Sequence, residues 1–174
     1  YPIEDAYTLN QPGTRFPSHT DRNLPPGVDM TTGSLGQGVS GATGAALGNK
    51  LDGRASHVFC VVGDGEADEG QVWEALHFAY AHKLDNIIYI FDNNGYQLDG
   101  PTADILDHGG LAKKIEAFGL YTQEIDGHDL DAIYQAVQNA YAKSGVPSCI
   151  VIDTIKGYER LLPLLLTGLG RMIM

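Results

Sequence analysis

Two short polar segments, Gly63-Asp64-Gly65 and Asn93-Asn94, contain residue types that could bind a metal ion together with a phosphate group. Each follows an apolar, β-branched run, at 57–62 and at 87–91, of the kind that forms buried strands. The segment between them, 69–83, has apolar residues at a helical spacing. The pattern predicts two parallel strands joined by a right-handed helical crossover. Both polar segments would then lie at the carboxyl edge of one sheet, where open α/β folds bind ligands.

Asp64 is the first candidate metal ligand. A carboxylate at a strand end can reach a Mg²⁺ or Ca²⁺ ion, while the glycine after it lets the Gly65 amide approach a phosphate closely. Asn94 would add a side-chain oxygen without adding charge. The alternative is a solvent-exposed turn, because Asp-Gly and Asn-Gly are common turn pairs. The presence of both segments on one strand–helix–strand unit favours the metal site.

These segments resemble the thiamine diphosphate motif, and their surroundings resemble the transketolase family. The resemblance extends from Phe16 to Gly157. It is carried by Thr31-Thr32-Gly33-Ser34-Leu35-Gly36-Gln37-Gly38, Asp64-Gly65-Glu66, Trp73-Glu74-Ala75, Asp92-Asn93-Asn94 and Gln97-Leu98-Asp99-Gly100. It implies thiamine diphosphate and Mg²⁺ (or Ca²⁺) as cofactors, with Asp64 and Asn94 as metal ligands.

The resemblance also implies roles for residues around this pair. The backbone carbonyl two positions beyond Asn94, that of Tyr96, would be a third protein ligand of the metal. Gly65 and Glu66 would belong to the cofactor-binding segment.

The glycine-rich segment, 31–38, would contact the other end of the cofactor through Gly33, Ser34 and Leu35. Leu35 would make the apolar contact, and the alternative is a core leucine before a helix. His19 lies near the position of a family histidine that faces the reacting carbons, and the alternative is a surface loop histidine. Glu69 and Glu74 match positions at the family's dimer interface, although Glu69 could simply stabilise a helix amino terminus.

By the same resemblance, the activity is transfer of a two-carbon ketol unit between sugar phosphates. The glutamate that activates the cofactor belongs to the pyrimidine-binding domain, which is absent from this chain. We therefore expect a partner pyrimidine-binding subunit or domain, in a homo- or hetero-oligomer. Three alternatives stay open. The first is the α subunit of a 2-oxo-acid dehydrogenase, which would share Asn93-Asn94-Gly95-Tyr96. The others are an inactive truncated homologue and deoxyxylulose-phosphate synthase. The last is disfavoured by the segment 31–38.

Composition narrows the class of protein. The 174 residues have a net charge of −11 and no basic runs, which argues against a nucleic-acid surface. No signal peptide and no long apolar run is found, so we expect a cytoplasmic protein without a membrane span. Cys60 and Cys149 lie in strand-like runs without CxxC spacing, which is typical of buried free thiols.

The remaining segments continue the alternation of strands and helices. Helices are expected at 34–51, 111–118 and 130–142, and strands at 119–125 and 149–154. The first of these helices is rich in small residues, which permits close packing against a neighbour. Together they predict an α/β fold with a doubly wound, mostly parallel sheet and helices on both faces. One diphosphate-binding domain would cover 1–157, followed by a divergent tail, 158–174, of unknown role.

Overall fold

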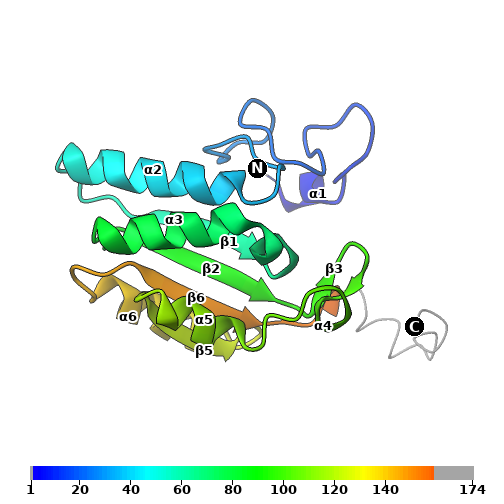
Figure 1. The fold of residues 1–174 in the computed structure, drawn as a ribbon. Helices are drawn as coiled ribbons and strands as arrows, with labels where there is room; N and C mark the ends of the chain where they lie inside the picture. The colour runs from blue at the N-terminus through cyan, green and yellow to red at the C-terminus, as the bar shows by residue number, and fades with distance from the viewer. Residues whose placement is uncertain (1, 159–174) are drawn as a thin grey trace.

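The structure, a computed structural model, describes residues 2–158 (Figure 1). Its centre is a four-stranded sheet in the order β1-β2-β6-β5, in which all neighbours are parallel. The strands are β1 (Val58–Gly63), β2 (Ile87–Asn93), β5 (Tyr121–Asp126) and β6 (Ser148–Asp153). The carboxyl ends of β2 and β6 point toward β3 and α4 (Figure 1). The predicted mostly parallel α/β fold is confirmed.

The four principal helices are α2 (Gln37–Leu51), α3 (Gly70–Ala81), α5 (Leu111–Ala117) and α6 (Leu130–Tyr141). Short elements lie between or before them: α1 (Ile3–Ala6), the 3-10 helix η1 (Gly65–Asp68), β3 (Tyr96–Gln97), β4 (Gly100–Pro101) and α4 (Thr102–Ile105). The sequence predicted the long elements and missed these short ones, whose two to four residues are too few to show a periodic pattern.

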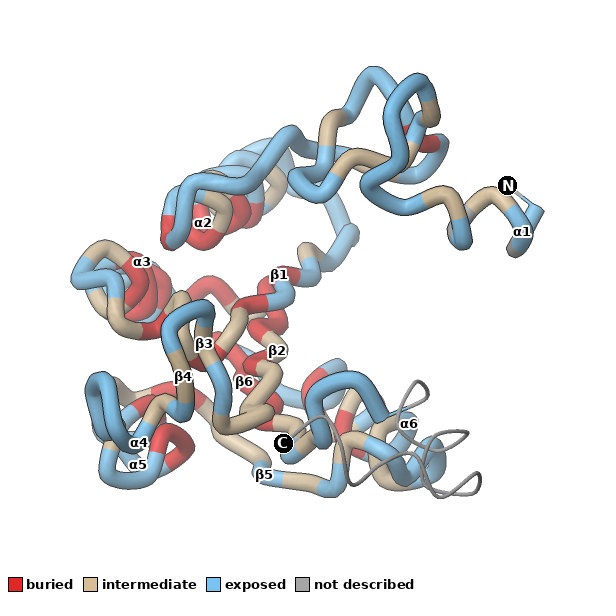
Figure 2. Tube along the Cα trace, turned by 90° about the vertical axis from the view of Figure 1, so that its right-hand side faces the viewer, coloured by how far each residue is buried: buried red, intermediate tan, exposed pale blue. Residues whose placement is uncertain are grey.

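The sheet has helices on both faces. One face packs against α2, α3 and α5 through the larger apolar cluster, and the other packs against α6 through a smaller cluster that includes Ile88 and Ile150. In Figure 2, α3 and α5 lie on one side of the strands and α6 on the other. This arrangement explains the apolar runs in β2 and β6, because a parallel strand between two helical layers is buried on both faces.

A buried polar pair fixes the contact between the sheet and α2. Tyr89 in β2 is fully buried, and its hydroxyl lies 2.7 Å from Thr43 Oγ1 in α2. Thr43 Oγ1 in turn donates to the Val39 carbonyl at 2.7 Å, so the Tyr89 hydroxyl is the donor to Thr43. Burial raises the pKa of Tyr89, which keeps this hydroxyl protonated.

The start of α2 differs from the prediction. A helix was expected from residue 34, but α2 begins at Gln37, because Gly36 has φ +77°, in the left-handed region that a helix interior excludes. Ser34 and Leu35 are therefore left in an exposed turn before the helix.

Of the divergent tail predicted at 158–174, residues 159–174 lie outside the described residues. Within residues 2–158, none of the helices has the length and apolar character needed to cross a bilayer.

Candidate cofactor-binding site

The two polar segments meet at the carboxyl edge of the sheet, as predicted. Gly63 pairs with Asp92 at the ends of β1 and β2, and the Asp64 amide donates to the Asp92 carbonyl at 3.2 Å. The Asp64 side chain is buried, with 1% of the residue exposed. Its Oδ1 accepts from the Gly65 amide at 2.8 Å, and its Oδ2 accepts from the Gly95 amide at 2.6 Å. A hydrogen bond across 31 positions of sequence therefore joins the two segments.

Asn94 is oriented by its neighbours on both sides. Its Nδ2 donates to Asp92 Oδ2 at 3.0 Å, and its Oδ1 accepts from the Tyr96 amide at 3.1 Å. Lys156 Nζ donates a hydrogen bond of 3.5 Å to the Tyr96 carbonyl. Hydrogen bonds thus link the segments that contain the three candidate metal ligands. These ligands are the Asp64 carboxylate, the Asn94 amide oxygen and the Tyr96 carbonyl.

This donor set suits a hard cation that also carries ligands of its own. All three groups present oxygen, the ligand atom that Mg²⁺ and Ca²⁺ prefer. Three protein oxygens are fewer than the six or more that these cations take, which leaves coordination positions for phosphate oxygens and water. A buried carboxylate is costly without a charge partner, and within residues 2–158 no ion pair joins Asp64 to a basic side chain. The residues therefore fit a metal–diphosphate group.

Gly65 permits a close approach between the two segments. A Cβ added at this position would lie 2.6 Å from Gln97 Cβ, closer than real Cβ atoms come. The Gln97 Nε2 atom is buried and has no hydrogen-bond partner among the described residues. A donor without a partner beside Asp64 and Gly65 is a further observation that fits an anionic group at this edge.

The Glu66 carboxylate accepts hydrogen bonds from two backbone amides. Its Oε1 accepts from the Gly36 amide at 2.7 Å, and its Oε2 accepts from the Gly63 amide at 3.3 Å. Gln71 Nε2 adds a bond of 2.8 Å to the Leu35 carbonyl. Glu66 therefore joins the glycine-rich turn, residues 33–36, to the end of β1, and Gln71 joins the same turn to α3.

The remaining predicted site residues line two clefts beside this turn. His19, which is exposed, lies against Gly33, and both line a cleft of about 590 Å³ with Ser34. Ser34, Leu35 and Glu66 line an adjacent, larger cleft of about 850 Å³. Leu35 is 53% exposed, so the alternative of a core leucine is wrong.

Glu69 and Glu74 are both exposed. Glu69 is the residue before α3, but its side chain makes no capping hydrogen bond. Its position at the amino end of α3 is nevertheless one at which the helix dipole favours a carboxylate.

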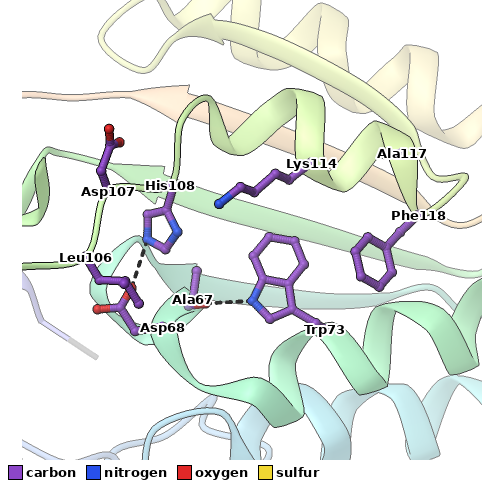
Figure 3. Close-up of a pocket in the computed structure, with 9 residues that line it drawn as sticks. All are labelled: Ala67, Asp68, Trp73, Leu106, Asp107, His108, Lys114, Ala117 and Phe118. Carbon is purple, nitrogen blue, oxygen red and sulfur yellow. Dashed lines mark hydrogen bonds and ion pairs between the residues drawn. The ribbon is translucent and has the colours of Figure 1, made fainter.

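Sequence reasoning missed His108. The loop before α5 brings its ring beside Asp64 and Asp68, at the wall of a cavity of about 300 Å³ that also contains Trp73 and Phe118 (Figure 3). The segment Asp107-His108-Gly109-Gly110, directly before the predicted helix at 111–118, was the signal that could have drawn attention to it.

A family model described as "Transketolase, thiamine diphosphate binding domain" matches residues 1–162. The chain belongs to the transketolase family. Transketolase is thereby favoured over the α subunit of a 2-oxo-acid dehydrogenase, and the resemblance carried by the sequence motifs is confirmed.

Curated relatives include proteins that are named as transketolase subunits. The chain is 48% identical over 157 residues to the 6-deoxy-6-sulfo-D-fructose transketolase subunit SqwG of Clostridium sp. (strain MSTE9), covering 90% of this chain and 57% of the relative. It is 37% identical over 150 residues to an apulose-4-phosphate transketolase subunit from Actinobacillus succinogenes (strain ATCC 55618 / DSM 22257 / CCUG 43843 / 130Z), covering 86% and 54%. The chain thus spans about half the length of these curated relatives.

Solved transketolases share the fold. The structure matches transketolase from Campylobacter jejuni subsp. jejuni NCTC 11168 with a TM-score of 0.77 and 33% identity, over 89% of this chain and 25% of that one. It also matches transketolase from Leishmania mexicana with a TM-score of 0.78 and 30% identity, over 88% and 24%. The α/β arrangement described above is therefore that of the thiamine diphosphate-binding part of transketolase.

Proposed function

We propose that this chain binds Mg²⁺ and the diphosphate of thiamine diphosphate, and that it transfers a two-carbon ketol unit between sugar phosphates together with a pyrimidine-binding partner. The observation that carries the proposal is the buried Asp64 carboxylate. It is held by the Gly65 and Gly95 amides and lacks a basic side-chain partner among the described residues. Asp64, Asn94 and the Tyr96 carbonyl would hold the metal.

The glycine-rich turn would hold the opposite end of the cofactor. Gly33, Ser34 and Leu35 are exposed where the turn borders a cleft, and Glu66 fixes the turn against β1. The exposed apolar side chain of Leu35 would cover the thiazolium end of the cofactor and exclude water there. His19, across from Gly33, would donate to or accept from a hydroxyl of the sugar substrate.

Thiamine diphosphate, when bound, supplies the carbon nucleophile that carries the two-carbon unit. The residues of this chain would bind and orient it, with the metal bridging its diphosphate to the protein. Among residues 2–158, no residue is assigned to the glutamate that the resemblance places against the aminopyrimidine. That group would come from the partner, in keeping with relatives that are named as subunits and extend well beyond the matched region.

Two classes of ketose are candidate donors of the two-carbon unit. The resemblance to transketolase favours a ketose phosphate, whereas the relative at 48% identity is named for a 6-sulfonated fructose. Both carry an anionic group at the end of the sugar remote from the reacting carbons.

The test is reconstitution. The full-length protein that contains this chain is mixed with its pyrimidine-binding partner, thiamine diphosphate and Mg²⁺, and product formation is measured with a ketose phosphate or a 6-sulfo ketose and an aldose phosphate acceptor. We expect turnover only when partner, cofactor and metal are all present. Ketol transfer by the chain without its partner would contradict the proposal.

A second outcome separates the enzyme from the inactive homologue. An assembled, folded protein that binds neither Mg²⁺ nor thiamine diphosphate would favour the inactive alternative. An assembled protein that binds both but turns over neither donor would contradict the proposed substrates while leaving the cofactor site in place.

A further inference from the structure

The His108 side chain lies against the carboxyl edge of the sheet beside Asp64, although it is 44 positions away from Asp64 in the sequence. Only 11% of the side chain is exposed. Its Nε2 is 2.9 Å from the Asp64 backbone carbonyl oxygen and 3.2 Å from Asp68 Oδ1. Figure 3 shows the ring extending from the loop before α5 toward Asp68.

The two neighbours of Nε2 identify it as a donor. A backbone carbonyl and a carboxylate both accept hydrogen bonds, so Nε2 carries the hydrogen. The contact with Asp68 meets the distance of an ion pair, yet Asp68 Oδ1 has no hydrogen-bond partner among the described residues. The directed bond is therefore the one to the Asp64 carbonyl.

The loop around His108 is built to hold the ring in this place. Asp107 Oδ1 accepts from the Gly109 amide at 2.8 Å, a turn that closes over His108. Gly109 and Gly110 follow with φ +59° and +96°, conformations that other residues rarely adopt. The chain then enters α5 at Leu111, which is 5% exposed and anchors the loop in the core.

Asp64 is held through all of its polar groups. Its amide bonds to β2, its carboxylate bonds to the Gly65 and Gly95 amides, and its carbonyl accepts from the Ala67 amide at 3.1 Å as well as from His108. Within residues 2–158, His108 provides the one side chain among these hydrogen-bond partners.

We propose that His108 is a positioning residue: its Nε2–H holds the Asp64 carbonyl and so fixes the orientation in which the Asp64 carboxylate meets the metal–diphosphate group. This inference rests on the proposed cofactor site and deepens it. Among the described residues, no hydrogen bond joins the ring to Asn94 or to the glycine-rich turn, so its effect on the cofactor passes through Asp64.

A packing role is the competing explanation, because the ring also lines the cavity of about 300 Å³ beside Trp73 and Phe118. Substitutions at this position can separate the two roles. His108→Phe keeps a ring in the cavity and removes the donor. His108→Gln keeps an amide nitrogen close to the place of Nε2. His108→Asn also carries an amide, but its side chain is one methylene too short to reach.

The experiment uses the assembled protein with its pyrimidine-binding partner. Calorimetric titration measures the Kd of thiamine diphosphate at saturating Mg²⁺, a second titration measures the Mg²⁺ concentration for half-saturation at fixed cofactor, and thermal unfolding is followed without ligands. His82, an exposed histidine at the end of α3, receives the same three substitutions as a control.

We expect His108→Phe and His108→Asn each to raise the Kd and the half-saturating Mg²⁺ about tenfold, and His108→Gln to stay within about threefold of the wild type, as the loss of one hydrogen bond implies. The His82 variants should change neither value. Should His108→Phe fail to fold, the contrast between Gln and Asn decides the matter.

Two results would overturn the inference. Variants that lower the melting temperature but leave both titrations at wild-type values would assign His108 to packing alone, with the proposed function intact. A wild-type protein that does not bind thiamine diphosphate with Mg²⁺ would overturn the proposed function and this inference with it.

Discussion

Glu66 holds the glycine-rich turn at Gly36: its Oε1 accepts from the Gly36 amide at 2.7 Å across 30 positions of sequence. Its second oxygen accepts from the Gly63 amide at the end of β1. One carboxylate therefore sets the distance between the turn that contains Leu35 and the edge that contains Asp64. Both ends of the candidate cofactor site depend on this spacing.

Replacing Glu66 with glutamine should loosen the turn. The glutamine oxygen can still accept from one amide, but its NH₂ group would face the other N–H donor, and the loss is worth about 1–2 kcal/mol. We expect faster hydrogen exchange at the Gly36 amide and weaker binding of thiamine diphosphate by the assembled protein. Hydrogen-exchange mass spectrometry over 34–37 measures the first effect. Glu116→Gln, at an exposed position of α5, is the matched control. Unchanged exchange in Glu66→Gln would mean that the turn is held by other contacts.

Removal of the Asp64 carboxylate should abolish metal-dependent cofactor binding. Asp64→Ala deletes the one anionic protein ligand of the candidate metal, whereas Asn94→Ala removes a neutral ligand and should weaken binding by about tenfold. Calorimetric titration of the assembled protein with thiamine diphosphate and Mg²⁺ distinguishes the two. Asp52→Ala, at an exposed aspartate that pairs with Arg54, should bind as the wild type does. Wild-type affinity in Asp64→Ala would refute the assignment of the metal site.

Loss of the Tyr89 hydroxyl should destabilise the fold. In Tyr89→Phe the buried Thr43 oxygen keeps its bond to Val39 but loses the hydroxyl that it accepts from, at a cost of about 1 kcal/mol in the free energy of unfolding. Urea unfolding measures this value. Tyr134→Phe serves as the control because Tyr134 is 67% exposed, and it should leave the midpoint where it is. An unchanged midpoint in Tyr89→Phe would show that the buried pair adds nothing to stability.

The buried thiol of Cys60 predicts a fall in stability at alkaline pH. Burial, and secondarily the charge of Glu66, raises the pKa of Cys60 from 9.0 to about 12. In the unfolded chain the thiol loses its proton near the ordinary value, so above it the unfolded state binds fewer protons than the folded state. The free energy of unfolding therefore decreases as pH rises from about 9 toward 12.

Urea midpoints measured from pH 8 to about 10.5 check this prediction. They should decline, and Cys60→Ala should make the decline shallower because it removes one of the groups whose pKa differs between the two states. A decline of the same slope in Cys60→Ala would assign the alkaline loss of stability to other groups.

We predict that α2, whose small residues permit close packing, and α3 lie at or near a subunit interface. Added Cβ atoms at Gly44 and Gly48 would meet nothing within 4 Å, so this side of α2 is open in the described part of the chain. Gly44→Arg should then lower the sedimentation coefficient of the assembled protein without lowering its helical content, because arginine is the better helix former. Ala142→Arg, at the exposed end of α6, should leave assembly unchanged. Normal assembly in Gly44→Arg would place the interface elsewhere.

The sequence by itself determined the alternation of strands and helices and the meeting of the two polar segments, 63–65 and 93–94. Periodicity predicts elements, and parallel strands bring their carboxyl ends to one edge, so two polar segments that follow neighbouring strands have to meet there. The motifs around them were also sufficient to indicate the transketolase family, since both segments occur in order at family-like spacing.

Tertiary structure decided the contacts between distant segments. Glu66 was predicted as a cofactor residue. Only the folded chain shows that its carboxylate accepts hydrogen bonds from the Gly36 and Gly63 amides. His108 had no visible link to Asp64 in the sequence, because its loop follows a different strand and contains no periodic pattern. Hydrogen bonds of this kind depend on the relative placement of loops, which is set by how helices and sheet pack and leaves no regular spacing in the sequence.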